Sequence, residues 1–391
     1  KNQLDNIFSF IDNSLNDENG LLYSSISAVT EVGDEKIEGD YYIWKKNNLK
    51  EILGKNYELF EDYYNVNKVG FWEKDKYVLK RERDDNFFIE KYNISKNQLE
   101  SKIKESIKIL KKSRENRLKP IVDDKFVTSW NALSVIGLSD AYQSTGDNKF
   151  LDKALEIISA VEKNLVKKNL IVDRSLSGSN ESILFLEDYS FLISAYLSLY
   201  QSTFNYDFID RADELAKKTL SLFSHEESPF LRFSTDQSLF FSNDLFVNQD
   251  GVMPSPNSVM CENLFLLSHH TGNRKYYQTG KLMIDAMAND IIDNTLDHMN
   301  WLNVSLDYND KFFEVVISGK KSYEMANEIS SKYFPNILIA ASKKDSDKYL
   351  LKNRYNRGET LIYVCVNNTC KFPVNNVNEA LKLITKKDEK I

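Results

Sequence analysis

The chain has few of the residues that build metal sites, disulfide frameworks and nucleic-acid surfaces. Among 391 residues there are three cysteines, four histidines and six prolines. Three cysteines do not make a disulfide framework. The formal net charge of −7 lacks the basic surplus expected of a protein that binds nucleic acid. His269 and His270 are adjacent, so they point in different directions and are interpreted as packing and surface residues. Acid–base chemistry is therefore expected to fall to carboxylates.

Membrane, targeting and common catalytic signals are also missing. No apolar run approaches the roughly 20 residues that a membrane span requires. No signal peptide is visible, so we expect a cytoplasmic protein. The chain opens at Lys1 rather than Met, so a preceding segment that directs it to the periplasm or to a lipid anchor stays an alternative. Gly-rich phosphate loops, Gly-x-Ser-x-Gly elbows and His-Glu-x-x-His pairs do not occur, and we expect no metal or cofactor.

The stretch from residue 120 to residue 131 crowds polar side chains between two predicted helices. The upstream helical pattern, 95–119, ends before a proline, which disfavours helical backbone in the residue preceding it. The downstream helix is expected to begin near Thr128 or Ser129, both good N-caps. Exposed amides at such a helix start favour anionic or hydroxyl-rich ligands. The polar residues are Asp123, Asp124, Lys125, Trp130 and Asn131. A charged cap with a Lys125 salt bridge is the structural alternative.

A tight helix–helix turn recurs three times between residues 125 and 293. Its copies are 144–150, 202–208 and 270–276, and each is followed by a small residue, Ala154, Ala212 or Gly280. The aromatic residue that ends each copy should pack the two helices together, and the small residue should let them approach. The copies lie about 60 residues apart, beyond the spacing of helical solenoids. Such hairpins close into a superhelix or into a ring around a central cavity.

Each hairpin is preceded by a polar cluster. The clusters at the second and third hairpins contain Glu187, Asp188 and Tyr189, and then Asp250, Asn257 and Ser258. In a ring these clusters and residues 123–131 would meet at one end. Pockets between helices with a few placed polar groups are common binding sites. We therefore expect Asp123, Asp124, Glu187 and Asp188 to be catalytic, and Lys125, Trp130, Asn131, Tyr189, Asp250, Asn257 and Ser258 to bind the substrate.

The pattern changes after residue 310. Residues 313–317, 336–341 and 360–366 read as strands, and 322–333 and 377–384 as helices. We expect two domains, a helical one (1–310) and a small α/β module (311–391). Cys365 and Cys370 belong to the module, and a disulfide, a redox pair, half a metal site or two buried thiols are all open. An amphipathic helix at 4–15 carries an apolar stripe that needs a partner.

Four ordered runs together resemble a known family. They are residues 123–131, 186–189, 254–259 and 363–374, and they resemble the YyaL / spermatogenesis-associated protein 20 family, whose members carry a thioredoxin-like domain and a six-hairpin-glycosidase-like body. The resemblance implies a mainly α protein, an (α/α)6 toroid like those of sugar epimerases and glycosidases, from a bacterium. It also implies that the thioredoxin-like domain and first hairpins are missing here, so we expect an incomplete ring. That missing half, from the same gene or a separate chain, is an expected partner.

Three functions are compatible with this reading. The first is an enzyme that acts on a sugar or glycan through its carboxylates. The second is a non-catalytic binding or scaffold protein, favoured because 27–30 replace an Asp-Ala-Asp-Ser run usual in the family. The third is a redox role in which Cys365 and Cys370 serve a thioredoxin-like partner. We expect no nucleic-acid partner and no membrane span.

Overall fold

The computed structural model describes residues 2–33, 35–176, 183–235, 245–367 and 369–385. The chain divides into two compact units, one made of residues 1–23 with 125–391 and the other of residues 24–124. The predicted boundary near residue 310 falls in the first unit, between helix α12 (Met299–Asn309) and strand β9 (Phe313–Ser318). As a domain division it stays a prediction.

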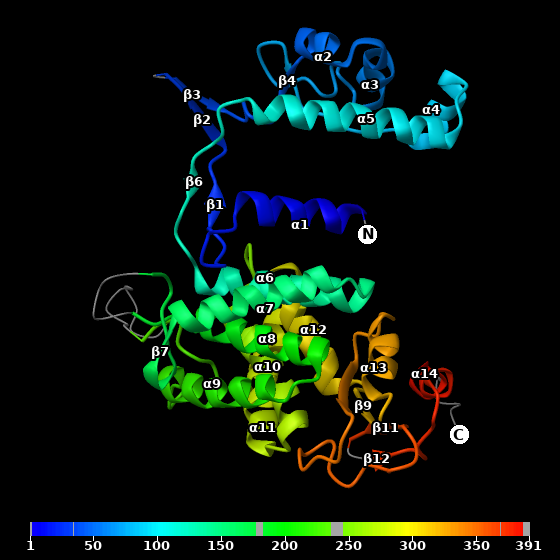
Figure 1. The fold of residues 1–391 in the computed structure, drawn as a ribbon. Coiled ribbons are helices and arrows are strands. Elements are labelled where there is room, and N and C mark those ends of the chain that lie inside the picture. Colours follow the sequence, from blue (N-terminus) through cyan, green and yellow to red (C-terminus); the bar gives the residue numbers. More distant parts are fainter. Residues whose placement is uncertain (1, 34, 177–182, 236–244, 368, 386–391) are drawn as a thin grey trace. The chain divides into compact units, whose positions relative to one another are not determined.

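Three antiparallel helical hairpins form the body of the first unit (Figure 1). Their helices are, in pairs, α6 (Thr128–Thr145) with α7 (Asn148–Asn164), α8 (Leu186–Thr203) with α9 (Asp207–Phe223), and α10 (Pro256–Thr271) with α11 (Arg274–Asp293). The first helices of the hairpins also pack on one another, α6 on α8 and α8 on α10. The mainly helical fold built from α-hairpins is confirmed.

The recurring turn ends the first helix of each hairpin in the same way. The residue after the helix is left-handed in all three, with φ of 68° at Gly146, 54° at Phe204 and 70° at Gly272. Glycine adopts this conformation without strain, whereas phenylalanine must be held there by its surroundings. The aromatic residues that end each turn, Phe150, Phe208 and Tyr276, are buried, as are the small residues that follow. The predicted packing of the hairpins is confirmed.

The N-terminal helix finds its partner within the first unit. Helix α1 (Asn2–Ser14) packs on α7, where the Phe8 ring meets Phe150 edge to face at 5.4 Å. Asp5 pairs with Lys149, and the buried Lys153 lies 3.2 Å from Asp12. The apolar stripe predicted to need a partner therefore packs on a helix more than 130 residues away.

The C-terminal module is a small sheet with two helices. Its elements are β9, α13 (Ser322–Ser330), β10 (Ile337–Ser342), β11 (Leu361–Val366), β12 (Thr369–Cys370) and α14 (Val377–Thr385). The strand order is β10-β9-β11-β12, with β9 and β10 parallel and the other pairs antiparallel. The predicted α/β module is confirmed. Before it, the first unit also contains the β7–β8 pair (Val166–Lys167, Ile171–Val172) and 3-10 turns at Lys168–Leu170 and Thr295–His298.

The second unit has a core of its own around a long amphipathic helix. That helix, α5 (Lys96–Glu115), begins with a capping box formed by Ser95 and Gln98 and buries Leu99, Ile103 and Leu110. Around it lie α2 (Lys46–Leu53), a 3-10 turn (Gly54–Asn56), α3 (Tyr57–Tyr63) and α4 (Asp85–Tyr92). Its strands pair as β1 (Ser25–Ile26) with β6 (Val122–Asp123), β2 (Val29–Val32) with β3 (Glu35–Glu38), and β4 (Trp44–Lys45) with β5 (Lys76–Tyr77).

Candidate functional site

The asparagine at the start of α6 binds the chain's own backbone. The Asn131 side chain is 1% exposed. Its Oδ1 accepts a hydrogen bond from the Leu22 amide at 2.8 Å, and its Nδ2 donates to the carbonyls of Leu22 and Val127, both at 3.0 Å. The amide predicted to bind a ligand hydroxyl is therefore saturated by backbone and holds the segment after α1 against the helix start.

The predicted binding residues before α10 are engaged in the same manner. Asn257 is completely buried and exchanges two hydrogen bonds with the backbone of Leu231, at 2.8 and 3.0 Å. The Asp250 carboxylate accepts from the Asn300 amide, and the Ser258 hydroxyl accepts from the Asn300 side chain. These contacts fix the loop before α10 to the start of α12, so the three side chains are not offered to a ligand.

The two acids at the start of α8 share one arginine. Arg174 pairs with Glu187, and its guanidinium lies 3.5 Å from the carboxylate of Asp188. Asp188 is completely buried and also accepts a hydrogen bond from the Ser129 amide at 3.0 Å. Burial raises the pKa of Asp188 to about 7 in spite of Arg174, and the charge of Glu187 adds to the rise. Two of the four predicted catalytic acids thus do lie together, but in a buried ion-pair cluster.

The other predicted residues are spread over different environments. Asp123 ends β6 and Asp124 follows it, both in the second unit, with Asp124 exposed. Lys125 and Trp130 are exposed in the first unit, and Trp130 has 41% of its surface accessible. Tyr189 is completely buried, and its hydroxyl bonds to the backbone of the preceding loop. The Tyr189 ring therefore has no accessible face, whereas Trp130 keeps an accessible ring, and their binding of a ligand stays a prediction.

We expect Arg174→Met to destabilise the protein by about 2 kcal/mol at pH 8, because it leaves two buried acids without their cation; the partial exposure of Arg174 reduces the cost below that of a fully buried pair. A carboxyl with a raised folded-state pKa stabilises the fold in its protonated form, and this contribution is lost as pH rises through about 7. The cost should therefore be smaller at pH 5. Urea unfolding at both pH values measures it.

A matched control is Arg211→Met. Arg211 pairs with Glu162 at the surface, so its loss should cost under about 1 kcal/mol. If both variants lowered the free energy of unfolding equally, and by the same amount at both pH values, the ion-pair role of Arg174 would be contradicted.

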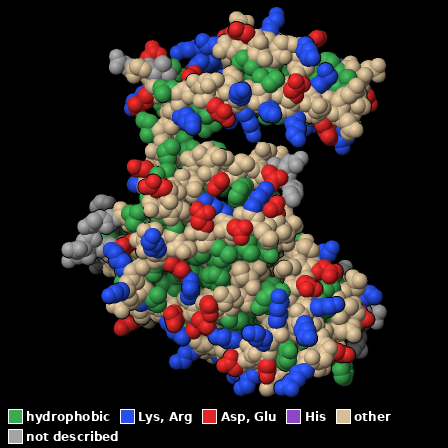
Figure 2. All heavy atoms as spheres, viewed as in Figure 1, with side chains coloured by type: hydrophobic (Ala, Val, Ile, Leu, Met, Phe, Trp, Pro, Cys, Tyr) green, Lys and Arg blue, Asp and Glu red, His purple; other side chains and the backbone are tan. Residues whose placement is uncertain are grey.

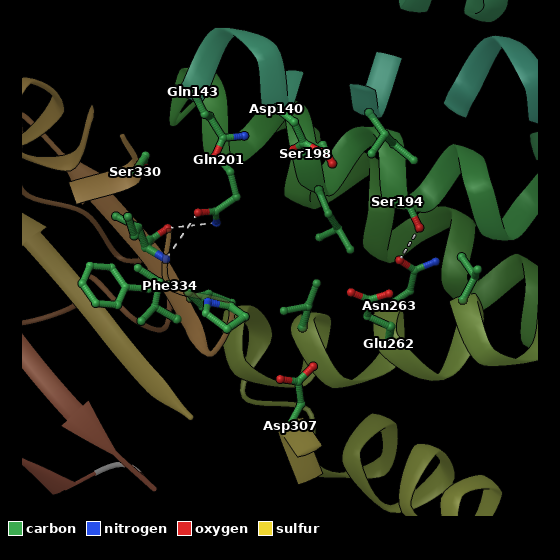
Figure 3. A pocket seen from close by; sticks show the side chains of 18 of the residues that line it. Asp140, Gln143, Ser194, Ser198, Gln201, Glu262, Asn263, Asp307, Ser330 and Phe334 are labelled. Carbon is green, nitrogen blue, oxygen red and sulfur yellow. Dashed lines mark hydrogen bonds between the residues drawn. The ribbon is translucent and has the colours of Figure 1, made fainter. Parts of the chain in front are cut away.

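A cavity that sequence reasoning missed lies among the helices of the first unit (Figure 3). Its volume is about 400 Å³, and its walls come from α6, α8, α10, α12 and the strand β10. Three acids line it, Asp140 from α6, Glu262 from α10 and Asp307 from α12. In Figure 3 their side chains extend into the same space from three different helices. The cavity, rather than the helix starts, gathers carboxylates that face solvent.

The pKa of each carboxylate of the cavity is raised. Partial exclusion of water by the surrounding protein is the main cause for each of them. The charge of Asp140 adds to the rise at Glu262, and the charge of Glu262 helps to raise the pKa of Asp307 to about 7. Asp140 is exposed, while Glu262 and Asp307 are half-buried. Asp307 can therefore hold a proton near neutral pH.

Neutral polar groups complete the wall. The Ser194 hydroxyl donates to Asn263 Oδ1 at 2.8 Å, which fixes the amide between α8 and α10. Gln201 exchanges hydrogen bonds with the backbone of Ile339, at 3.1 and 3.3 Å, and so ties α8 to β10. Phe191, Phe312 and Phe334 add apolar surface. Amides, hydroxyls, carboxylates and rings around one hollow are what a polyhydroxylated ligand requires.

The sequence did contain a signal for this cavity. Helices α6 and α10 bury residues on almost all sides, as a helix surrounded by protein does. An acid in the middle of such a helix, like Glu262, has no outer solvent face and must meet a partner or a cavity. The predicted site residues lie at helix starts, where polar residues are common, and do not include the acids within apolar helices.

The two adjacent histidines are interior residues. His269 Nδ1 lies 2.7 Å from the buried Glu314 Oε1 in β9. His270 is 3% exposed and lies edge to face against Tyr200. The interpretation of these histidines as packing residues holds for His270, whereas placing one at the surface was wrong.

The cysteines of the module are bonded to each other. Cys365 in β11 and Cys370 in β12 are opposite residues of an antiparallel pair and form a disulfide. The Arg354 guanidinium lies 3.3 Å from the Cys370 sulfur and 3.8 Å from that of Cys365. Of the alternatives left open for Cys365 and Cys370, the structure therefore contains the disulfide, and not two buried thiols or half of a metal site. A redox role for this disulfide stays a prediction.

Within the described residues, no three histidine, cysteine, aspartate or glutamate side chains are grouped so that they could hold a metal ion. Likewise, no helix in the described part of the chain is long and apolar enough to cross a membrane. On the face shown in Figure 2, basic and acidic side chains are interspersed.

Comparison of the chain with solved structures gives partial likenesses. A GH76 α-mannanase from Bacteroides thetaiotaomicron aligns with a TM-score of 0.39 at 14% identity, over 59% of this chain and 68% of that one. A cellobiose 2-epimerase from Bacillus thermoamylovorans aligns with a TM-score of 0.35 at 14% identity, over 73% and 72%.

Comparison with curated sequences gives longer matches. No family model matches the chain. An uncharacterised protein of Caenorhabditis elegans is 25% identical over 90% of this chain and 52% of its own length. Human spermatogenesis-associated protein 20 is 20% identical over 97% of this chain and 54% of its own length. The chain thus spans about half the length of these relatives. These relatives are animal proteins, so a bacterial source of this chain stays a prediction. A thioredoxin-like domain in the rest of the protein also stays a prediction. The expected resemblance is confirmed: the chain is similar to spermatogenesis-associated protein 20 over almost its whole length.

Proposed function

We propose that this chain binds a sugar in the cavity among α6, α8, α10 and α12 and acts on it by general acid–base catalysis. The observation that carries the proposal is the convergence of Asp140, Glu262 and Asp307, from three helices, on one cavity of about 400 Å³. That volume lies within the range of small-molecule sites. We therefore assign to Asp140, Glu262 and Asp307 the catalytic role that was first predicted for acids at the helix starts.

The proposed roles follow from the protonation states. Asp307, with its pKa raised to about 7, can donate a proton to a leaving or ring oxygen near neutral pH. Glu262 is the carboxylate whose charge raises that pKa, and it is placed to accept a proton in the same step. The pKa of Glu262 is raised as well, by burial and by the charge of Asp140, so the two roles are assigned by this proposal and not by their pKa values alone. The amide of Gln143 supplies donors and acceptors for sugar hydroxyls.

The test combines binding and turnover. Neutral mono- and disaccharides are screened for binding by saturation-transfer NMR, and for hydrolysis or epimerisation by proton NMR of the products. For the sugar that binds, Glu262→Gln and Asp307→Asn should retain binding and lose turnover on the order of 100-fold, since each removes one proton-transfer group. Asp290→Asn, an exposed acid on α11, should change neither.

The outcomes separate the alternatives. Binding without turnover in the unaltered protein would replace the enzyme by a non-catalytic sugar-binding protein. No binding by any sugar would overturn the proposal.

A further inference from the structure

The charge balance of the cavity goes beyond what a neutral sugar requires. Three of its lining residues are acids, and among the described residues that line it Lys332 is the one cation. Lys332 is exposed and follows α13, so its ammonium is largely solvated. The cavity therefore has a negative potential that its own side chains leave uncompensated.

A buried histidine that lines the cavity has a ring nitrogen without a hydrogen-bond partner among the described residues. His270 lines the cavity from α10 and is 3% exposed. Its Nδ1 has no hydrogen-bond partner among the described residues. Burial and the neighbouring His269 lower the pKa of His270 to about 3, so the imidazole is neutral and adds no positive charge. A buried polar atom left unpaired costs free energy that a ligand can recover.

The shape of the acidic cluster excludes a simple metal site. No group of three acids or histidines among the described residues is close enough to hold one ion. The carboxylates instead extend from separate helices toward a common space that also holds amides and hydroxyls (Figure 3). A larger organic cation can meet several separated carboxylates at once, while its neutral groups bond to the rest of the wall.

We propose that the ligand of this cavity is a sugar with a free, protonated amine, whose ammonium pairs with one of the carboxylates of Asp140, Glu262 and Asp307 while its hydroxyls bond to the others. This inference rests on the proposed function and adds the charge of the substrate. The ammonium supplies a positive charge that the cavity wall does not, and the sugar hydroxyls meet Gln143 and Ser198. An N-acylated amine is neutral and lacks this attraction.

The experiment measures the affinities of glucose, glucosamine and N-acetylglucosamine by calorimetry at pH 5.5 and 7.5, and at 50 and 500 mM NaCl. We expect glucosamine to bind at least about 10-fold more tightly than the two neutral sugars at pH 7.5 and low salt. After correction for the fraction of glucosamine that is protonated at each pH, its advantage should shrink at pH 5.5, because Asp307 is then protonated. It should also shrink at high salt, whereas the affinity for glucose should change with neither variable.

Variants assign the effect to the cavity. Asp140→Asn and Glu262→Gln should each reduce the preference for glucosamine about 3- to 10-fold, while Asp290→Asn, exposed on α11, should leave it unchanged. Equal affinities for glucose and glucosamine would overturn this inference and leave the proposed function standing. Failure of all three sugars to bind would overturn both. Tight binding of spermidine with no sugar binding would likewise overturn both, in favour of a polyamine site.

Discussion

Asn131→Ala is expected to destabilise the protein by about 3–4 kcal/mol. The substitution removes three hydrogen bonds, each worth about 1 kcal/mol net, and leaves the backbone of Leu22 unpaired in a buried site. Because Leu22 follows α1, the loss should also loosen the contact of α1 with α7. Urea unfolding monitored by circular dichroism measures the change, and hydrogen exchange of α1 amides reports the local effect.

Two comparisons make this prediction specific. Asn257→Ala should cost a similar amount, since Asn257 holds the Leu231 backbone in the same way. Ser134→Ala, three positions further along α6, removes a hydroxyl that bonds only to the Trp130 carbonyl of its own helix and should change stability by less than about 0.5 kcal/mol. If Asn131→Ala were as mild as Ser134→Ala and weakened sugar binding instead, the ligand-binding role predicted from sequence would be restored.

Gly280→Ala is expected to destabilise the protein by about 3 kcal/mol, although alanine is the better helix former. A Cβ at Gly280 would overlap the hydroxyl of Tyr308. That tyrosine is buried and packs on Phe265 and Tyr277, so it cannot swing aside without disturbing α10–α12. Overpacking of this kind outweighs the gain of about 1 kcal/mol in helix propensity. Thermal and urea unfolding measure the net effect.

Gly137→Ala supplies the control with the opposite sign. Gly137 is also inside a helix, α6, but it is exposed and a Cβ there would meet no atom within 4 Å. This variant should be more stable by about 0.5–1 kcal/mol. Adding Tyr308→Phe to Gly280→Ala should recover part of the loss, because it removes the overlapping oxygen. A neutral Gly280→Ala variant would show that α10, α11 and α12 are not packed as closely as the structure has them.

The predicted site and the cavity differ for a physical reason. Polar side chains at helix starts have two uses, to bind ligands and to satisfy the backbone amides and loops that helix ends leave unpaired. The side chains of Asn131, Asp188 and Asn257 bond to backbone amides of the chain itself. Sequence alone does not distinguish this structural use from ligand binding. Glu262 looks unremarkable in sequence, yet its position within a buried helix leaves it facing a hollow.

The sequence by itself determined the local architecture. Three turn motifs with their aromatic and small residues specified three α-hairpins, because helix ends, left-handed caps and close helix contacts depend on residues near one another in the chain. Short, nearly continuous apolar runs likewise specified the strands of the C-terminal module. Only the tertiary structure decided which surfaces meet: α1 on α7, Cys365 with Cys370 as a disulfide, Arg174 between Glu187 and Asp188, and three acids around one cavity. Those contacts join residues from distant parts of the chain or depend on the exact side-chain placement, and burial then sets the pKa values that give the cavity its proposed chemistry.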